Sequence, residues 1–178
     1  MKKFSNLIAL VLSTVMILTL LTSCSMAGDS FANFDRKFKS DSAKQAEILE
    51  EINDLRSENG NAALKETRQA DAIAKKYAAL YALYDQKKIE TSVYDDYRQK
   101  LDATKLNGHT HIGRASVTGN GENGIANEMD LYRWSTAKIY QSGSMASYSK
   151  VFTDSTATVA GIAVVQLDGR YTTVIVTF

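Results

Sequence analysis

The sequence contains no proline and only one cysteine, Cys24. A single cysteine rules out an intramolecular disulfide, so the folded part must be stabilised by its hydrophobic core. A cysteine nucleophile is also excluded, because Cys24 lies at the end of an N-terminal segment that reads as a targeting signal. The absence of proline points to no particular function.

An excess of charge of one sign is also lacking. The chain has 21 lysine and arginine residues against 20 aspartate and glutamate residues, a formal net charge of +1. Proteins that bind nucleic acids concentrate positive charge to neutralise phosphates. The near-neutral composition therefore argues against a nucleic-acid partner and provides no polybasic patch for anionic lipid.

The first residues have the organisation of a secretory leader. Lys2 and Lys3 precede an apolar run over residues 7–21, and Leu-Thr-Ser-Cys follows at residues 21–24. A basic head, an apolar stretch and small residues before a cleavage site define a signal peptide. The run is short for a bilayer span, which needs roughly 20 residues. An uncleaved membrane anchor is the alternative.

Leu-Thr-Ser-Cys resembles the lipobox of bacterial lipoproteins, which implies that diacylglycerol is attached to Cys24. Two acyl chains hold a protein stably on a membrane. We therefore expect a signal peptide over residues 1–23, a lipidated N-terminus and tether over 24–44, and a folded domain over 45–178. The predicted location is the extracytoplasmic face of the cell membrane.

The tether carries three phenylalanines, Phe31, Phe34 and Phe38, at helical spacing. Two interpretations remain open at this point. The segment forms a short helix that packs on the domain, or it presents an apolar stripe to the membrane beside the lipid.

Apolar periodicity predicts helices in the first half of the folded part. Ile48, Ile52 and Leu55 share one face of a helix that should stop near Asn59 and Gly60, residues that tolerate positive φ. A second helix is predicted over residues 66–88, and its tyrosines fit the apolar stripe, so we expect them in the core. The stripe consists of Ala70, Ile73, Tyr77, Leu80 and Tyr84, with Tyr81 alongside.

The remaining elements change from helix to strand toward the C-terminus. A third helix is predicted from Ser92, with Ser92 and Asp95 as a capping pair, and a fourth over residues 128–141. A strand is expected over 112–118. Two more, over 159–167 and 171–178, flank Asp-Gly, a strong hairpin signal. Helices first and strands last, without βαβ alternation, predict an α+β domain with helices packed on a mostly antiparallel sheet.

Four segments share a pattern with a known family. They are residues 51–56 (Glu-Ile-Asn-Asp-Leu-Arg) with Leu64, residues 121–123 (Gly-Glu-Asn), Trp134, and residues 148–152 followed by 159–163. In this order they resemble the CAP superfamily, also called SCP-like, of cysteine-rich secretory, antigen five and pathogenesis-related proteins. The resemblance implies a three-layer αβα sandwich. It also places Asn53 and Arg56 on the first helix, where we expect them to support the fold.

Members of that family often have a cavity lined by two histidines and one or two glutamates, which in some holds a divalent metal. Glu122 matches the family's glutamate, but Ser147, just before Tyr148, stands where the second histidine would lie. We therefore expect Glu122, Ser147 and Tyr148 to line a degenerate cavity. His109 and His111 share a face if extended and are candidate metal ligands with Glu122. The alternative is a polar loop with two solvated histidines.

These observations favour a binding protein over an enzyme. No G-x-S-x-G elbow or H-E-x-x-H helix is present. We expect no resident cofactor and a lipid, sterol or protein ligand for the CAP-like domain. The enzymatic alternative is a metal-assisted hydrolase or protease that uses His109, His111 and Glu122.

Overall fold

The computed structural model describes residues 30–120 and 146–178. The chain divides into two compact units, Met1–Asn33 and Phe34–Phe178. Of the first unit only residues 30–33 are described, and there the Asn33 N–H donates to the Ser30 carbonyl at 2.8 Å. The second unit carries all the helices and strands described below.

The elements of the second unit follow an α+β order, helices first and strands last. They are α2 (Ser42–Glu58), β1 (Lys65–Glu66), α3 (Arg68–Asp85), α4 (Thr91–Asp102), β2 (Gly113–Asn120), α6 (Ala146–Thr153), β3 (Val159–Leu167) and β4 (Arg170–Thr177). The described strands form one sheet in the order β1-β3-β4-β2. β1 pairs in parallel with β3, and the other pairs are antiparallel. The predicted fold class is confirmed, and the short parallel β1 is an addition to it.

The hairpin of β3 and β4 forms where Asp-Gly predicted it. Asp168 and Gly169 adopt positive φ angles of 48° and 80°, the conformation that a two-residue turn of matching twist requires. The register pairs Leu167 with Arg170 and Ile162 with Ile175. This hairpin forms the centre of the sheet.

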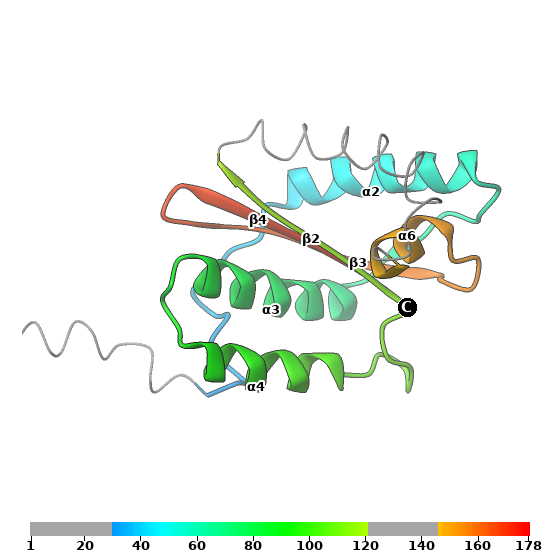
Figure 1. Cartoon of the computed structure of the whole chain (residues 1–178). Helices are drawn as coiled ribbons and strands as arrows, with labels where there is room; N and C mark the ends of the chain where they lie inside the picture. The colour runs from blue at the N-terminus through cyan, green and yellow to red at the C-terminus, as the bar shows by residue number, and fades with distance from the viewer. Residues whose placement is uncertain (1–29, 121–145) are drawn as a thin grey trace, which may run out of the picture. The chain divides into compact units, whose positions relative to one another are not determined.

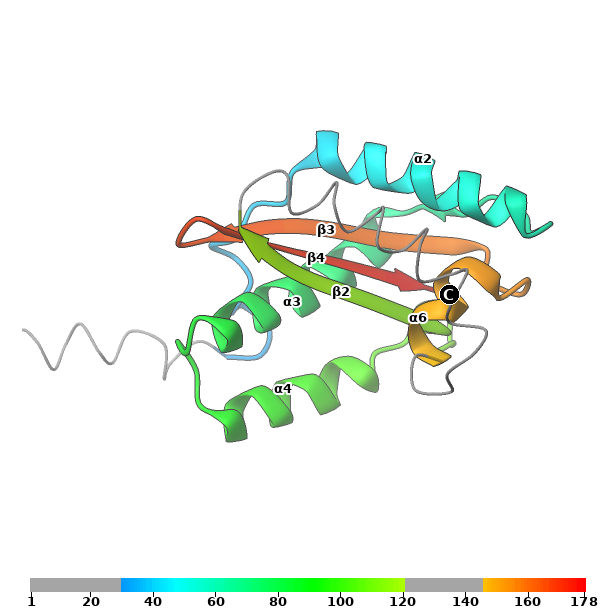
Figure 2. The same ribbon diagram turned by 45° about the horizontal axis from the view of Figure 1, so that its top comes forward.

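Helices cover both faces of the sheet, as Figures 1 and 2 show for the described part of the second unit. On one face α2 packs against β3, and α6 packs against β2 and the neighbouring β4. Successive side chains of a strand point to opposite faces of the sheet, so each face has its own set of core residues. The core of this layer contains Ile48, Ile52, Leu55, Val151, Phe152, Ile162, Val164 and Ile175.

On the opposite face α3 lies along β3 and β4, and α4 packs beside α3 (Figure 1). Small side chains allow α3 to approach closely, since Ala70, Ala74 and Ala78 are fully buried. Gly161 faces Ala70 in this layer. The α2 and α6 layer, the sheet, and the α3 and α4 layer make an αβα arrangement.

Two polar residues of α2 support the fold, as expected. Asn53 exchanges two hydrogen bonds with the backbone of Leu64, at 2.7 and 3.2 Å. Arg56 is fully buried, and its guanidinium donates to the carbonyls of Ala62, Val151, Asp154 and Ala157 at 2.8–3.2 Å. These bonds fasten α2 to the segments around α6 and to the approach to β1.

Some local expectations need correction. The predicted capping of the third helix by Ser92 and Asp95 is wrong, because α4 begins at Thr91 and its N-cap, Glu90, makes no side-chain capping bond. The tether forms turns over residues 31–37. Phe34 and Phe38 are 2% and 4% exposed, so these two rings pack on the domain.

Candidate functional site

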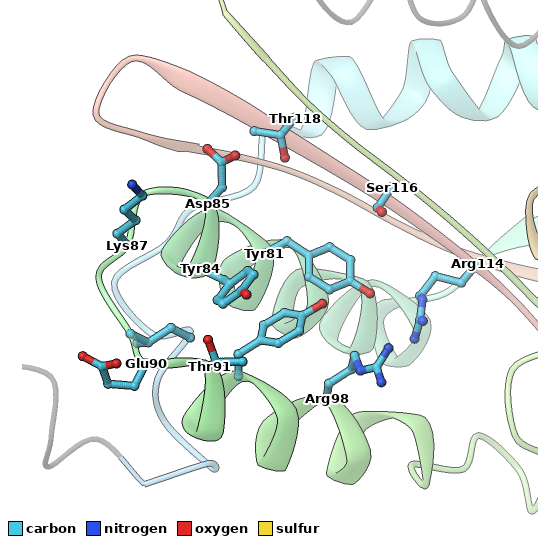
Figure 3. A pocket seen from close by; sticks show the side chains of 12 residues that line it. Tyr81, Tyr84, Asp85, Lys87, Glu90, Thr91, Arg98, Arg114, Ser116 and Thr118 are labelled. Carbon is cyan, nitrogen blue, oxygen red and sulfur yellow. The ribbon is translucent and has the colours of Figure 1, made fainter.

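A cavity of about 830 Å³ lies between α3, α4 and β2. Figure 3 shows its side chains converging from these three elements and from the loop between the helices. Ligand sites in proteins typically measure about 300–1,000 Å³, so the cavity has the size of a small-molecule site. Its walls are aromatic and polar, formed by Tyr81, Tyr84, Asp85, Lys87, Ile89, Glu90, Thr91, Tyr94, Arg98, Arg114, Ser116 and Thr118.

Strand alternation explains how β2 contributes to this wall. Arg114, Ser116 and Thr118 occupy alternate positions and therefore share one face of the sheet. Their partners on β4 are Val176, Val174 and Thr172, all buried on the face that α3 covers. Helix α3 lies over β3 and β4 but not over β2. The side chains of Arg114, Ser116 and Thr118 on β2 therefore extend into the space beside α3.

Four tyrosines form a continuous aromatic ladder along α3 and α4. The rings of Tyr84 and Tyr94 are stacked at 4.1 Å with 22° between their planes. Tyr81 lies 6.1 Å from Tyr94, and Tyr77 lies 6.0 Å from Tyr81. Aromatic pairs at these spacings attract each other beyond their buried area. Three members, Tyr81, Tyr84 and Tyr94, face the cavity, and Tyr77 is buried behind them.

Arg114 lies next to Tyr77, the last ring of this aromatic ladder. Its guanidinium pairs with the Asp102 carboxylate and lies over the Tyr77 ring at 4.7 Å. The Tyr77 hydroxyl donates to the same carboxylate at 2.7 Å. Burial opposes the charge on Arg114, but the nearby Tyr81, Tyr77 and Asp102 outweigh it and raise the pKa of Arg114. Asp102 therefore compensates this positive charge at neutral pH.

The tyrosine hydroxyls remain protonated at physiological pH. Burial raises the pKa of Tyr81 to about 12, and Arg114 and Arg98 act in the opposite direction. Burial also raises the pKa of Tyr94, again against Arg98 and Arg114. Both phenols are thus hydrogen-bond donors. Arg98 and Arg114 each favour a lower pKa for both hydroxyls, although burial prevails.

Arg98 differs from Arg114 in its partners. It extends from α4 into the cavity (Figure 3), and its Nε is buried without a hydrogen-bond partner among the described residues. Buried polar groups in proteins are nearly always hydrogen-bonded. Arg98 therefore lines the cavity with one donor that the described residues leave unsatisfied.

The two histidines lie in different surroundings. His111 is half-buried with its ring edge against Tyr77 at 6.0 Å, and burial, assisted by Arg114, lowers its pKa. His109 is exposed and lines a separate cavity of about 430 Å³ with Thr158 and Phe178. Among the described residues no group of three histidine, cysteine, aspartate or glutamate side chains is placed to hold a metal ion.

Several predicted site residues lie outside the described part. Glu122, Cys24 and the helix expected over residues 128–141 belong to the ranges that are not described. Ser147 and Tyr148 fall within α6, but their side chains are not described. The structure therefore leaves the predicted cavity around Glu122, Ser147 and Tyr148 untested.

Sequence reasoning missed the cavity between α3, α4 and β2. The tyrosines were expected in the core, which holds for Tyr77 at 0% exposed but not for Tyr84, which is 39% exposed. One available signal was Arg98, a cation placed four residues after Tyr94 and hence on the same helix face. The contribution of β2 had no comparable signal, because it depends on which strand lies beside α3.

No protein-family model and no curated protein matches the chain. The solved structures that are similar to it include three of low sequence identity. The hookworm platelet inhibitor is 12% identical with a TM-score of 0.49, and the match covers 79% of this chain and 71% of that one. An outer surface protein from Borrelia burgdorferi is 12% identical with a TM-score of 0.47, covering 79% of this chain and 95% of that one.

The third similar structure is a cysteine-rich secretory protein from Staphylococcus aureus. It is 16% identical with a TM-score of 0.43, and the match covers 76% of this chain but only 38% of that protein. Separately, no helix among residues 30–120 and 146–178 is long and apolar enough to cross a membrane.

Proposed function

We propose that this chain is a membrane-anchored extracytoplasmic lipoprotein whose CAP-like domain binds a small lipid-like ligand in the cavity between α3, α4 and β2. The observation that carries the proposal is the cavity itself, about 830 Å³ in volume with three tyrosine rings on its wall. Aromatic walls with a few convergent polar groups are typical of sites that hold amphipathic ligands.

The side chains at the cavity suit binding rather than bond cleavage. The lining residues that the structure describes include no histidine or cysteine. Of the two carboxylates among them, Asp85 pairs with Arg170 at 3.0 Å, and Glu90 lies at the N-terminus of α4. The remaining groups are hydrogen-bond donors and aromatic surface, which orient a ligand.

Two features support a CAP-like domain. Asn53 and Arg56, the residues of the helix signature, carry out structural roles by bonding backbone groups outside α2. Helices also cover both faces of a central hairpin-containing sheet, which agrees with the sandwich that the resemblance implies. The Leu-Thr-Ser-Cys sequence ending at Cys24 supports the anchor.

The binding half of the proposal is tested with the mature chain, residues 24–178, carrying Cys24→Ser so that it needs no detergent. Native mass spectrometry after incubation with a lipid extract should show bound ligand. Tyr84→Ala, which removes part of the cavity wall, should lower the bound fraction. Val93→Ala is the matched control, since Val93 has similar exposure on α4, 37% against 39%, and does not line the cavity. If the Cys24→Ser chain and both of its variants bind no lipid, the proposal is overturned.

The anchor is tested separately on material from the native host. Mass spectrometry should find a diacylglyceryl modification on an N-terminal Cys24. An unmodified thiol, or a leader still attached, contradicts the anchor and leaves the cavity result untouched.

A further inference from the structure

Arg98 brings a positive charge to the cavity that no described residue pairs with. Arg114 is compensated by Asp102, and at the rim Asp85 is engaged by Arg170 at 3.0 Å. Within the described part of the chain Arg98 makes no ion pair, and its buried Nε has no hydrogen-bond acceptor. A buried donor left without an acceptor is unfavourable, and a bound anion would supply the missing acceptor.

Hydrogen-bond donors surround the same point. The hydroxyls of Tyr81 and Tyr94 lie within the electrostatic reach of both Arg98 and Arg114, because both cations act on the pKa of each phenol. Figure 3 shows Arg98 and Arg114 entering the cavity from α4 and β2, on the side to which Tyr81 extends. A guanidinium group only donates hydrogen bonds, and a protonated phenol has an O–H to donate. This end of the cavity therefore suits a ligand group that accepts hydrogen bonds.

We propose that the cavity selects an organic anion, with its acidic group bound by Arg98 and the hydroxyls of Tyr81 and Tyr94, and its apolar body along the stacked rings of Tyr84 and Tyr94. The acidic group is a carboxylate or a comparable oxyanion, which guanidinium binds with two parallel hydrogen bonds. This inference rests on the proposed function and adds the charge of the ligand and its orientation.

The orientation follows from the order of groups along the cavity. Arg98 and Arg114 lie at the end of the cavity away from the α3–α4 loop, whereas Tyr84 lies beside that loop (Figure 3). The Tyr84 ring stacks on Tyr94. The anionic end therefore points toward Arg98 and Arg114, and the apolar body extends toward the loop. A neutral ligand of the same shape would leave the Arg98 donor unsatisfied.

The test uses the Cys24→Ser mature chain and two fluorescent probes that differ by one sulfonate, 1-anilinonaphthalene-8-sulfonate and the neutral N-phenyl-1-naphthylamine. We expect the anionic probe to bind more tightly, and its affinity to fall as salt screens the charge. Arg98→Gln should weaken the anionic probe by about tenfold or more, the effect of losing a charge-assisted hydrogen bond, while the neutral probe is unaffected. Arg68→Gln, the same change at the exposed start of α3, should alter neither.

A second variant, Arg98→Lys, keeps the charge without the planar fork and should give intermediate affinity, so the test stands even if Arg98→Gln fails to fold. Displacement of the anionic probe by laurate but not by dodecanol would identify an acyl ligand, and displacement by 2-naphthoate an aromatic acid. Equal affinity for both probes, or an Arg98→Gln protein that behaves like Arg68→Gln, overturns the anion selectivity and leaves the binding function intact. If neither probe nor any extract lipid binds, the proposed function fails as well.

Discussion

Gly161 of β3 lies directly against the backbone of Ala70 in the first turn of α3. A Cβ atom on residue 161 would lie 2.1 Å from the Ala70 carbonyl oxygen and 2.8 Å from the Ala70 Cβ. The absence of a side chain at residue 161 therefore sets how closely α3 approaches the sheet. This distance in turn positions the tyrosines of α3 beside β2.

Gly161→Ala is expected to destabilise the domain strongly. Overpacking a core typically costs about 1–3 kcal/mol, and here the obstacle is a backbone oxygen, which a rotamer change cannot move. The free energy of unfolding is measured by urea denaturation. Adding Ala70→Gly should not rescue the variant, because the carbonyl remains. Recovery in the double variant would show that the side chain, and not the backbone, sets the distance.

Arg56 is expected to be the most sensitive charged residue of α2. Its guanidinium serves four backbone carbonyls from separate segments, and burial lowers its pKa. Arg56→Met should lower the free energy of unfolding by about 3 kcal/mol or more, since several buried acceptors lose their donors together. Arg68→Met, at an exposed position of α3, is the control, and equal melting temperatures for the two variants would contradict this role.

Asp71 makes stability depend on pH. Burial raises its pKa to about 6, against the hydrogen bond from the Ile162 N–H and with the help of Glu66. The folded state thus takes up a proton at higher pH than the unfolded state, so the contribution of Asp71 to stability is full below the unfolded pKa and is lost as pH rises through about 6.

Asp71→Asn keeps an oxygen for the Ile162 N–H, at 3.1 Å in the native protein, but is never charged. We expect the variant to melt above the native protein at neutral pH and the difference to shrink on acidification. Melting curves on both sides of the pKa check this, with Asp54→Asn on the exposed side of α2 as control. A difference that does not change with pH would mean that the Asp71 carboxyl is not buried enough to resist ionisation.

Asp102 should tune the charge of the cavity. It compensates Arg114 and accepts from Tyr77, and the hydrogen bond from Tyr77 together with Arg114 lowers its pKa despite burial. Asp102→Asn removes the carboxylate that pairs with Arg114, so 1-anilinonaphthalene-8-sulfonate should bind several-fold more tightly, the opposite of the Arg98→Gln effect. Asp96→Asn, at an exposed position of α4, is the control. Unchanged affinity of the probe for the Asp102→Asn protein would show that the charge of Arg114 does not contribute to binding.

Local sequence signals were sufficient for most individual elements. The apolar face of Ile48, Ile52 and Leu55 predicted α2 and its end near Asn59, and Asp168-Gly169 predicted the hairpin. These signals work because helix periodicity and turn conformation depend on residues close together in the chain. The start of α4 differs from the prediction. Ser92 and Asp95 match a capping pattern, but the helix begins at Thr91 with Glu90 as its N-cap.

The α+β class, the helix faces and the central hairpin follow from local sequence patterns, since each depends on short-range periodicity and turn chemistry. Packing between elements far apart in the sequence turns Tyr81 and Tyr84 toward a cavity while Tyr77 is buried, and it places Arg114 of β2 and Arg98 of α4 on the wall of that cavity. The three tyrosines belong to one predicted helix stripe, and which of them face the cavity depends on how α3 lies across β3 and β4. That placement arises from contacts between distant residues, such as Gly161 with Ala70, which no local pattern encodes.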